Sequence, residues 1–165
     1  MPLLKRQQDN ALSVASTGSL LVAVFYGSPM VRHLDELKAI EDELIAQHGK
    51  FSLLVVGLDV LDGIRISDEV RKRSTEIAKA LDSKTLGTAF ALLQPGLTGI
   101  MLRTFLAGLS LIARTKSPQK TFGSVAEGVD WLQALPGQNL AVAREKHLAV
   151  QIGAFLADVA PNKVA

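Results

Sequence analysis

The chain has 165 residues, of which 48% are hydrophobic and 21% are charged, and it contains no cysteine. This length and composition are typical of one globular domain, and they exclude disulfides, thiolate metal sites and cysteine catalysis. The net charge of +2 at pH 7 is too small for the basic surface of a nucleic-acid-binding protein, so we expect no nucleic-acid partner.

The N-terminal third predicts a tail, two strands and a helix. Residues 1–10 lack the apolar core and cleavage site of a secretory signal. We expect them to form an N-terminal tail, and we expect the protein to be cytoplasmic. Residues 11–16 and 19–26 predict two tightly joined strands, the second buried on both faces. Ser28 is the expected helix cap, with Pro29 in the first turn, and Gly49 ends the helix. The acids of this helix, including Glu41, are expected between its apolar positions, and His33 at its surface or half-buried.

Buried strands and helices then alternate along the chain. Residues 51–60 and 86–93 are continuous apolar runs that predict buried strands. Ser67 is the expected N-cap of the helix between them, whose first turn contains Asp68. This alternation favours an α/β domain with a mainly parallel sheet of four or five strands and covering helices.

The segment 97–113 predicts a helix that is apolar nearly all round and whose one charge is Arg103. Such a helix is covered by the rest of the chain, a second subunit or a hydrophobic ligand, and these alternatives stay open. We expect no stable membrane insertion, because its 17 residues are at the lower limit for a span. The candidate partner, dimer or ligand contacts are Leu97, Ile100, Met101, Arg103, Phe105, Leu106 and Leu109.

The C-terminal third predicts a short edge strand over 119–122 and a helix that begins with a capping box from Ser124 to Glu127. This helix ends near Pro136, and one further helix follows. We therefore expect a domain over residues 11–136 and a C-terminal helical extension over 137–165.

No catalytic signature accompanies these elements. The sequence has no phosphate-binding glycine loop, no nucleophile elbow and no histidine pair at metal-ligand spacing. Four acids follow the second buried strand, and they could hold Mg²⁺ or could shape a turn and a helix start. They are Asp59, Asp62, Asp68 and Glu69. We expect no cofactor, no resident metal and no catalytic residue.

Three local patterns resemble the STAS superfamily of anti-sigma-factor antagonists. They are the passage LLVVGLDVLDGIRISDEV, the helix carrying Arg71, and the ending KTFGSVAEGVDWL, within residues 12–135. The nearest likeness is to a stand-alone bacterial variant that shares its fold with CRAL-TRIO lipid carriers. The resemblance implies partner switching through a phosphorylated residue at the start of that helix. The matching positions are Ser67 and Asp68, in the reverse of the family's order, and a plain N-cap role for Ser67 is the alternative.

The leading hypothesis is therefore a non-enzymatic regulatory or protein-interaction module of STAS-like type that forms a homodimer. Its contacts would come from the helix over 97–113 and from the helix start at Ser67. One alternative is a carrier or sensor of a hydrophobic small molecule or lipid. Another is a metal-dependent enzyme that uses Asp59 and Asp62.

Overall fold

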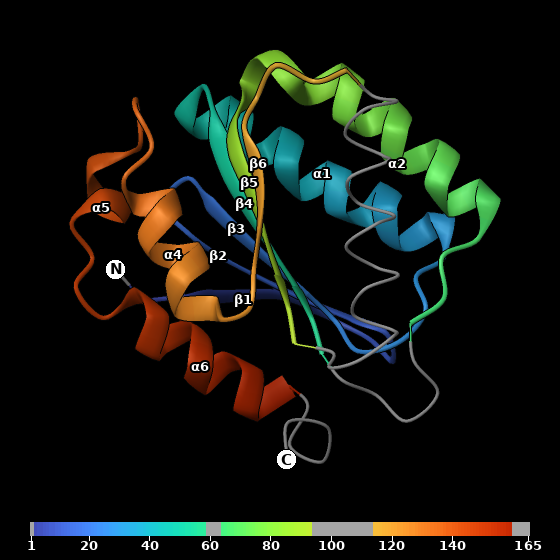
Figure 1. Cartoon of the computed structure of the whole chain (residues 1–165), viewed down its shortest axis with the longest axis horizontal. Coiled ribbons are helices and arrows are strands. Elements are labelled where there is room, and N and C mark those ends of the chain that lie inside the picture. The colour runs from blue at the N-terminus through green and yellow to red at the C-terminus, as the bar shows by residue number, and fades with distance from the viewer. Residues whose placement is uncertain (1, 59–63, 94–113, 160–165) are drawn as a thin grey trace.

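The computed structural model describes residues 2–58, 64–93 and 114–159, and these form one six-stranded sheet. The strands are β1 (Leu4–Gln8), β2 (Leu12–Thr17), β3 (Leu20–Phe25), β4 (Phe51–Gly57), β5 (Thr85–Leu92) and β6 (Gln119–Phe122). They lie in chain order, antiparallel from β1 to β3 and parallel from β3 to β6 (Figure 1). The α/β class and the mostly parallel sheet are confirmed, whereas the expected four or five strands are six.

The additional strand is β1, which lies where the sequence predicted a tail. Its residues, LKRQQ, offer almost no apolar pattern, and it pairs with β2 at the edge of the sheet. Polar contacts also hold it to the neighbouring helix. Arg6 pairs with Glu43, and the Gln7 amide donates a hydrogen bond to Glu36. Backbone pairing and these contacts therefore place β1, and a search for apolar periodicity misses it.

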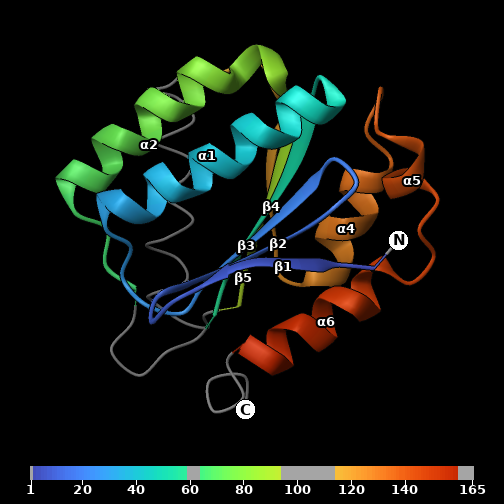
Figure 2. The ribbon, with the colours of Figure 1, turned by 180° about the vertical axis from the view of Figure 1, so that it is seen from behind.

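Helices cover both faces of the sheet. They are α1 (Val31–His48), α2 (Asp68–Leu81), α4 (Val125–Gln133), α5 (Leu140–Ala143) and α6 (Leu148–Val159), with a 3₁₀ turn at Asp82–Lys84. Figures 1 and 2 show α1 and α2 on one side, and α4, α5 and α6 on the other. Successive side chains of a strand point to opposite faces. Accordingly, Leu21 packs on the α1 side and Val22 on the α4–α6 side.

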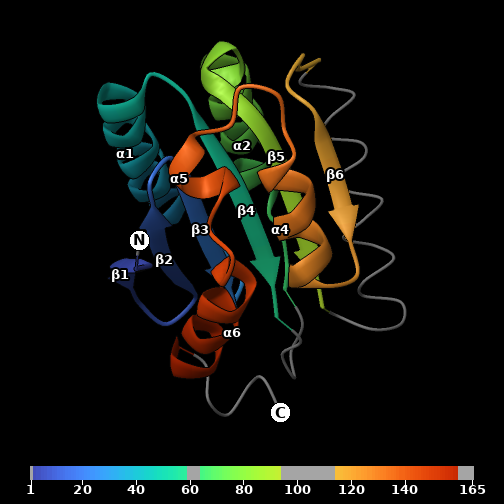
Figure 3. The same ribbon diagram turned by 90° about the vertical axis from the view of Figure 1, so that its left-hand side faces the viewer.

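The C-terminal region belongs to the same core as the sheet. The single helix expected after Pro136 is two helices, because the chain turns between Ala143 and Leu148. In α6, Leu148 is 1% exposed and Ile152 is fully buried, and both pack in the core of the α4–α6 face. Figure 3 shows α4, α5 and α6 together on this side of the sheet. Helices α5 and α6 thus pack with α4 on this face of the sheet. In the part of the chain that the structure describes, no helix has the length and hydropathy to cross a membrane.

Two of the expected helix caps are confirmed and one is wrong. Ser67 Oγ accepts a hydrogen bond from the Val70 N–H, and Ser124 Oγ accepts one from the Glu127 N–H. Ser28 does not cap α1, because its Oγ accepts a hydrogen bond from the Arg65 N–H instead. The helix begins later, at Val31, with Met30 as its N-cap residue, and His33 Nδ1 accepts a hydrogen bond from the Met30 N–H.

The two faces of the central strands are covered unequally. On the α4–α6 face, Leu54 and Val56 of β4 and Ala89 of β5 have no exposed surface. On the other face, Val55 of β4 and Phe90 of β5 are only half-buried. Among the residues that the structure describes, space therefore remains beside β4 and β5 on the α1–α2 side of the sheet.

Candidate functional site

A cavity of about 210 Å³ lies on the α1–α2 side of the sheet, and we call it the α1–α2 cavity. Apolar side chains form most of its wall. From the sheet they are Phe25, Phe51, Leu53, Val55, Phe90 and Leu92. From the helices they are Leu34, Leu37, Val70, Ile77, Ala78 and Leu81.

The cavity follows from the way α2 packs. This helix lies mainly against α1, further from the sheet than α1 itself (Figures 1 and 2). Ile64 and Ile66, which lead into α2, also line the cavity. Val70 and Ile77 recur at helical spacing and point to the same space. A mainly apolar wall of this kind favours apolar molecules over water.

One carboxyl interrupts the apolar wall. Glu41 of α1 lines the cavity, is 4% exposed, and its Oε2 has no hydrogen-bond partner among the described residues. Burial, together with the nearby Asp42 carboxylate, raises the pKa of Glu41 from 4.5 to about 8, although Lys38 acts in the opposite direction. At pH 7 the Glu41 carboxyl is therefore mostly protonated and neutral.

Glu41 was expected between the apolar positions of α1, but it lies on the buried face of the helix. It stands four residues after Leu37 and three before Leu44, so it belongs to the buried stripe of the helix. His33 lies on the same stripe and is 1% exposed, which corrects the expected surface or half-buried position. The helical spacing of Glu41 and His33 relative to Leu37 was the signal that could have revealed the burial of both side chains.

Hydroxyl and amide groups line the cavity near the N-terminal ends of β5 and β6, from Thr85, Thr88, Thr115, Ser117 and Gln119. The Thr85 hydroxyl donates to the Leu81 carbonyl at 2.8 Å. Asp82 orders the adjoining loop by accepting hydrogen bonds from the Lys116 and Ser117 N–H groups. Burial opposes the net shift, but these bonds and the Lys116 charge lower the pKa of Asp82. The described wall contains no lysine, arginine or histidine.

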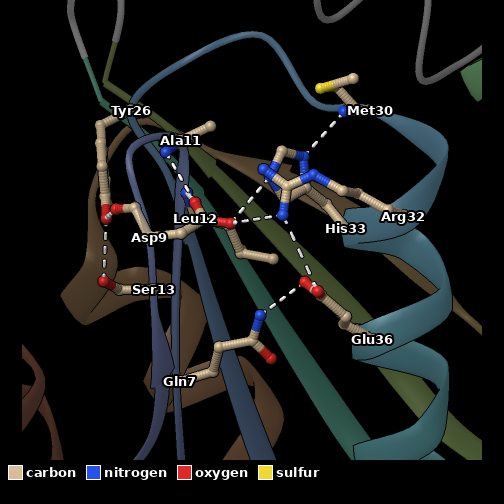
Figure 4. A network of polar contacts seen from close by, with 10 residues as sticks. All are labelled: Gln7, Asp9, Ala11, Leu12, Ser13, Tyr26, Met30, Arg32, His33 and Glu36. Atoms are coloured by element: carbon tan, nitrogen blue, oxygen red, sulfur yellow. Dashed lines mark hydrogen bonds and ion pairs between the residues drawn. The ribbon is translucent and has the colours of Figure 1, made fainter.

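A separate polar network joins the turn between β1 and β2 to the start of α1 (Figure 4). Asp9 Oδ1 accepts hydrogen bonds from the N–H groups of Ala11 and Leu12. Asp9 Oδ2 lies 2.8 Å from His33 Nε2 and 3.3 Å from an Arg32 guanidinium nitrogen. Burial opposes the shift, but the hydrogen bonds and these neighbours lower the pKa of Asp9.

The other contacts of this network are internal to the fold. His33 Nδ1 accepts a hydrogen bond from the Met30 N–H at 2.8 Å. The Tyr26 hydroxyl donates to the Asp9 carbonyl and lies 3.1 Å from Ser13 Oγ, and burial raises the pKa of Tyr26. We interpret the network as a structural clasp, that is, a set of polar contacts that holds the β1–β2 turn against the start of α1. Across the described ranges, no three His, Asp or Glu side chains gather as a metal site would require.

The residues expected from the sequence to act as a switch stand at the start of α2. Ser67 is exposed and caps the helix, with its Oγ 3.2 Å from the Val70 nitrogen. The Asp68 side chain is 99% exposed and lies 3.8 Å from the Arg71 guanidinium. Ile66 and Val70, on either side of this pair in sequence, line the cavity. The helix start and the cavity are thus neighbours.

The remaining candidate residues lie outside the described part of the chain. They are Asp59 and Asp62 of the metal hypothesis, and Leu97, Ile100, Met101, Arg103, Phe105, Leu106 and Leu109 of the apolar helix. Their contacts stay predictions.

The comparisons with known proteins bear on the fold. No protein-family model matches the chain, and no curated protein matches it in sequence. A crystal structure of an uncharacterized protein from the DUF3478 family of Shewanella loihica PV-4, described as having a SpoIIAA-like fold, is similar in structure. It is 14% identical, with a TM-score of 0.51, over 77% of this chain and 99% of that chain. The chain therefore has a SpoIIAA-like fold, and its resemblance to the STAS anti-sigma-factor antagonists is confirmed at the level of the fold.

Proposed function

We propose that the protein is a non-enzymatic STAS-like module that binds a small apolar molecule in the α1–α2 cavity, as a carrier or sensor. The observation that carries this proposal is the unequal covering of the sheet. Val55 and Phe90 are half-buried beside the cavity, while their neighbours Val56 and Ala89 are fully buried on the other face. Removing such apolar surface from water is favourable by about 25 cal/mol per Å².

The volume of the cavity limits its occupant. A cavity of about 150 Å³ with an apolar wall is large enough for benzene, whereas pockets for drug-sized ligands hold roughly 300–1,000 Å³. The 210 Å³ observed here lies between these values. A single ring or a short chain fits this space, and a helix or a loop of a partner protein does not. The geometry therefore supports small-molecule binding at this face better than docking of a protein.

Toluene titrations test the proposal, because toluene is apolar and of suitable size. We expect saturable binding and a rise in the melting temperature, since a ligand that binds only the folded state stabilises it. Ala78→Phe, which fills the cavity from α2, should abolish both effects. Ala80→Phe is the matched control, because Ala80 is on the same helix but exposed. Ser74→Leu gives a milder filling if Ala78→Phe folds poorly. Equal toluene binding by all the variants would contradict the proposal.

A regulatory homodimer is the second proposal. It is supported by the STAS-like fold and by the exposed position of Ser67 and Asp68 beside the cavity. Light scattering at high protein concentration tests the dimer, and the mass of one subunit would count against it. If the helix over 97–113 forms the dimer contact, Leu106→Asp gives a folded monomer. Unfolding of that variant would instead place Leu106 in the core.

The absence of enzymatic activity is also part of the proposal. It is supported by the neutral wall of the cavity, whose described residues offer one buried carboxyl and hydroxyl or amide groups. The competing metal-dependent enzyme needs Asp59 and Asp62. If Mg²⁺ raises the melting temperature of the wild type but not of Asp59→Asn, the metal hypothesis gains support over this proposal.

A further inference from the structure

We propose that Glu41 selects the ligand of the α1–α2 cavity, and that the natural occupant is a neutral, mainly apolar molecule with one hydroxyl group paired to the Glu41 carboxyl. This inference rests on the proposed function, because it names the chemistry of the molecule that the cavity would take. It goes beyond that function by assigning one residue to specificity.

One carboxyl oxygen of Glu41 has no hydrogen-bond partner among the described residues. Its side chain lies in the wall of the cavity, 96% of the residue is removed from solvent, and Oε2 has no partner among the described residues. Buried polar groups in folded proteins nearly always have a hydrogen-bond partner. The residues before and after it on the same stripe, Leu37 and Leu44, offer no polar group. With no partner for Oε2 among the residues that the structure describes, we take a ligand in the cavity as its partner.

The charged groups around the cavity favour a neutral ligand. No lysine, arginine or histidine belongs to the described wall, so a carboxylate ligand would find no counter-charge among these residues and would face Glu41. Lys38 is paired with Asp42 at 2.6 Å. Because burial keeps Glu41 protonated at pH 7, its neutral carboxyl both donates and accepts a hydrogen bond. A hydroxyl group has the same two capacities and buries no charge.

The cavity has a polar edge and an apolar edge, and this difference orients a ligand within it. Helix α1 runs from the end of β3 to the start of β4, and Glu41 lies beyond its midpoint, toward the N-terminal ends of the parallel strands. Thr85 and Gln119, which begin β5 and β6, line the cavity toward the same edge. Phe25 and Leu92 line it at the opposite edge. The ligand hydroxyl therefore points to the polar edge, and its apolar body points to the other.

Four compounds of similar shape test the inference on the full chain at pH 7: toluene, benzyl alcohol, benzylamine and benzoate. The wild type should bind benzyl alcohol more tightly than benzylamine or benzoate. Glu41→Leu should weaken the binding of benzyl alcohol about tenfold relative to the binding of toluene, because the hydroxyl group of the alcohol loses its hydrogen-bond partner. Glu41→Gln should keep the alcohol preference, since an amide also donates and accepts.

The outcomes separate this inference from the proposed function. If toluene binds but Glu41→Leu changes the affinities for toluene and benzyl alcohol by the same factor, the role of Glu41 is overturned and the apolar site stands. Tighter binding of benzylamine or benzoate than of benzyl alcohol overturns the neutral ligand class. If the wild type binds neither toluene nor benzyl alcohol, the proposed function fails and this inference fails with it.

Discussion

Replacing Glu41 by glutamine should remove a pH dependence from the stability of the protein. Burial raises the pKa of Glu41 from 4.5 to about 8 in the folded state. Its stabilising contribution is therefore complete below pH 4.5, where the folded and unfolded states both hold the proton, and it is lost as the pH rises toward 8. Between these values, the free energy of unfolding should fall by about 1.4 kcal/mol per pH unit because of this one group. The whole effect is about 5 kcal/mol at most.

Urea denaturation of the wild type and of Glu41→Gln at several pH values between 5 and 8 measures this effect. The contributions of the other titrating groups to the free energy of unfolding cancel when the two proteins are compared at each pH. Glutamine has nearly the same shape as glutamic acid and no charge, so the variant should become increasingly more stable than the wild type as the pH rises. A stability difference that stays constant across this range would refute the buried, protonated state of Glu41.

Three further predictions concern the stability of the fold. Asp9→Asn should lower the free energy of unfolding at neutral pH by about 1–2 kcal/mol. The variant should also lose less stability at acid pH. Because the pKa of Asp9 is lowered in the folded state, its contribution to the free energy of unfolding is present above pH 3.8 and is lost as the pH falls further. An equal loss of stability at acid pH in the variant and the wild type would argue against a structural role of the Asp9 network. Ser67→Ala should cost about 1 kcal/mol in chemical denaturation through loss of the α2 cap, and no loss would show that the cap is dispensable. Ile152→Ala should cost roughly 2–5 kcal/mol and Val150→Ala, at an exposed position, within about 0.5 kcal/mol, by the same assay; similar costs at both positions would contradict the packing of α6 on the sheet.

The central part of the fold was predictable from the sequence because its strands carry apolar side chains on both faces. Such strands are continuous apolar runs, and β3, β4 and β5 are found where those runs stand. The caps at Ser67 and Ser124 were predictable because a side-chain oxygen at that position satisfies a helix N–H through local geometry alone. These features depend on neighbours in sequence.

Features that depend on distant partners were not predictable. The strand β1 depends on pairing with β2, and the start of α1 depends on His33, which contacts Asp9 across the turn. The cavity is the clearest case, because it arises from the distance between α2 and the sheet, and no local pattern encodes this distance. The polarity of Glu41 concealed its burial, although its spacing from Leu37 and Leu44 indicated the inner face of the helix.

Intermolecular NOEs between toluene and the methyl groups of the protein are the most direct measurement of where an apolar molecule binds. The account predicts contacts from toluene protons to Val55, Leu53 and Ile77, which line the cavity. Contacts only to Val22 or Leu132, in the core of the opposite face, or none at saturating toluene, would contradict it.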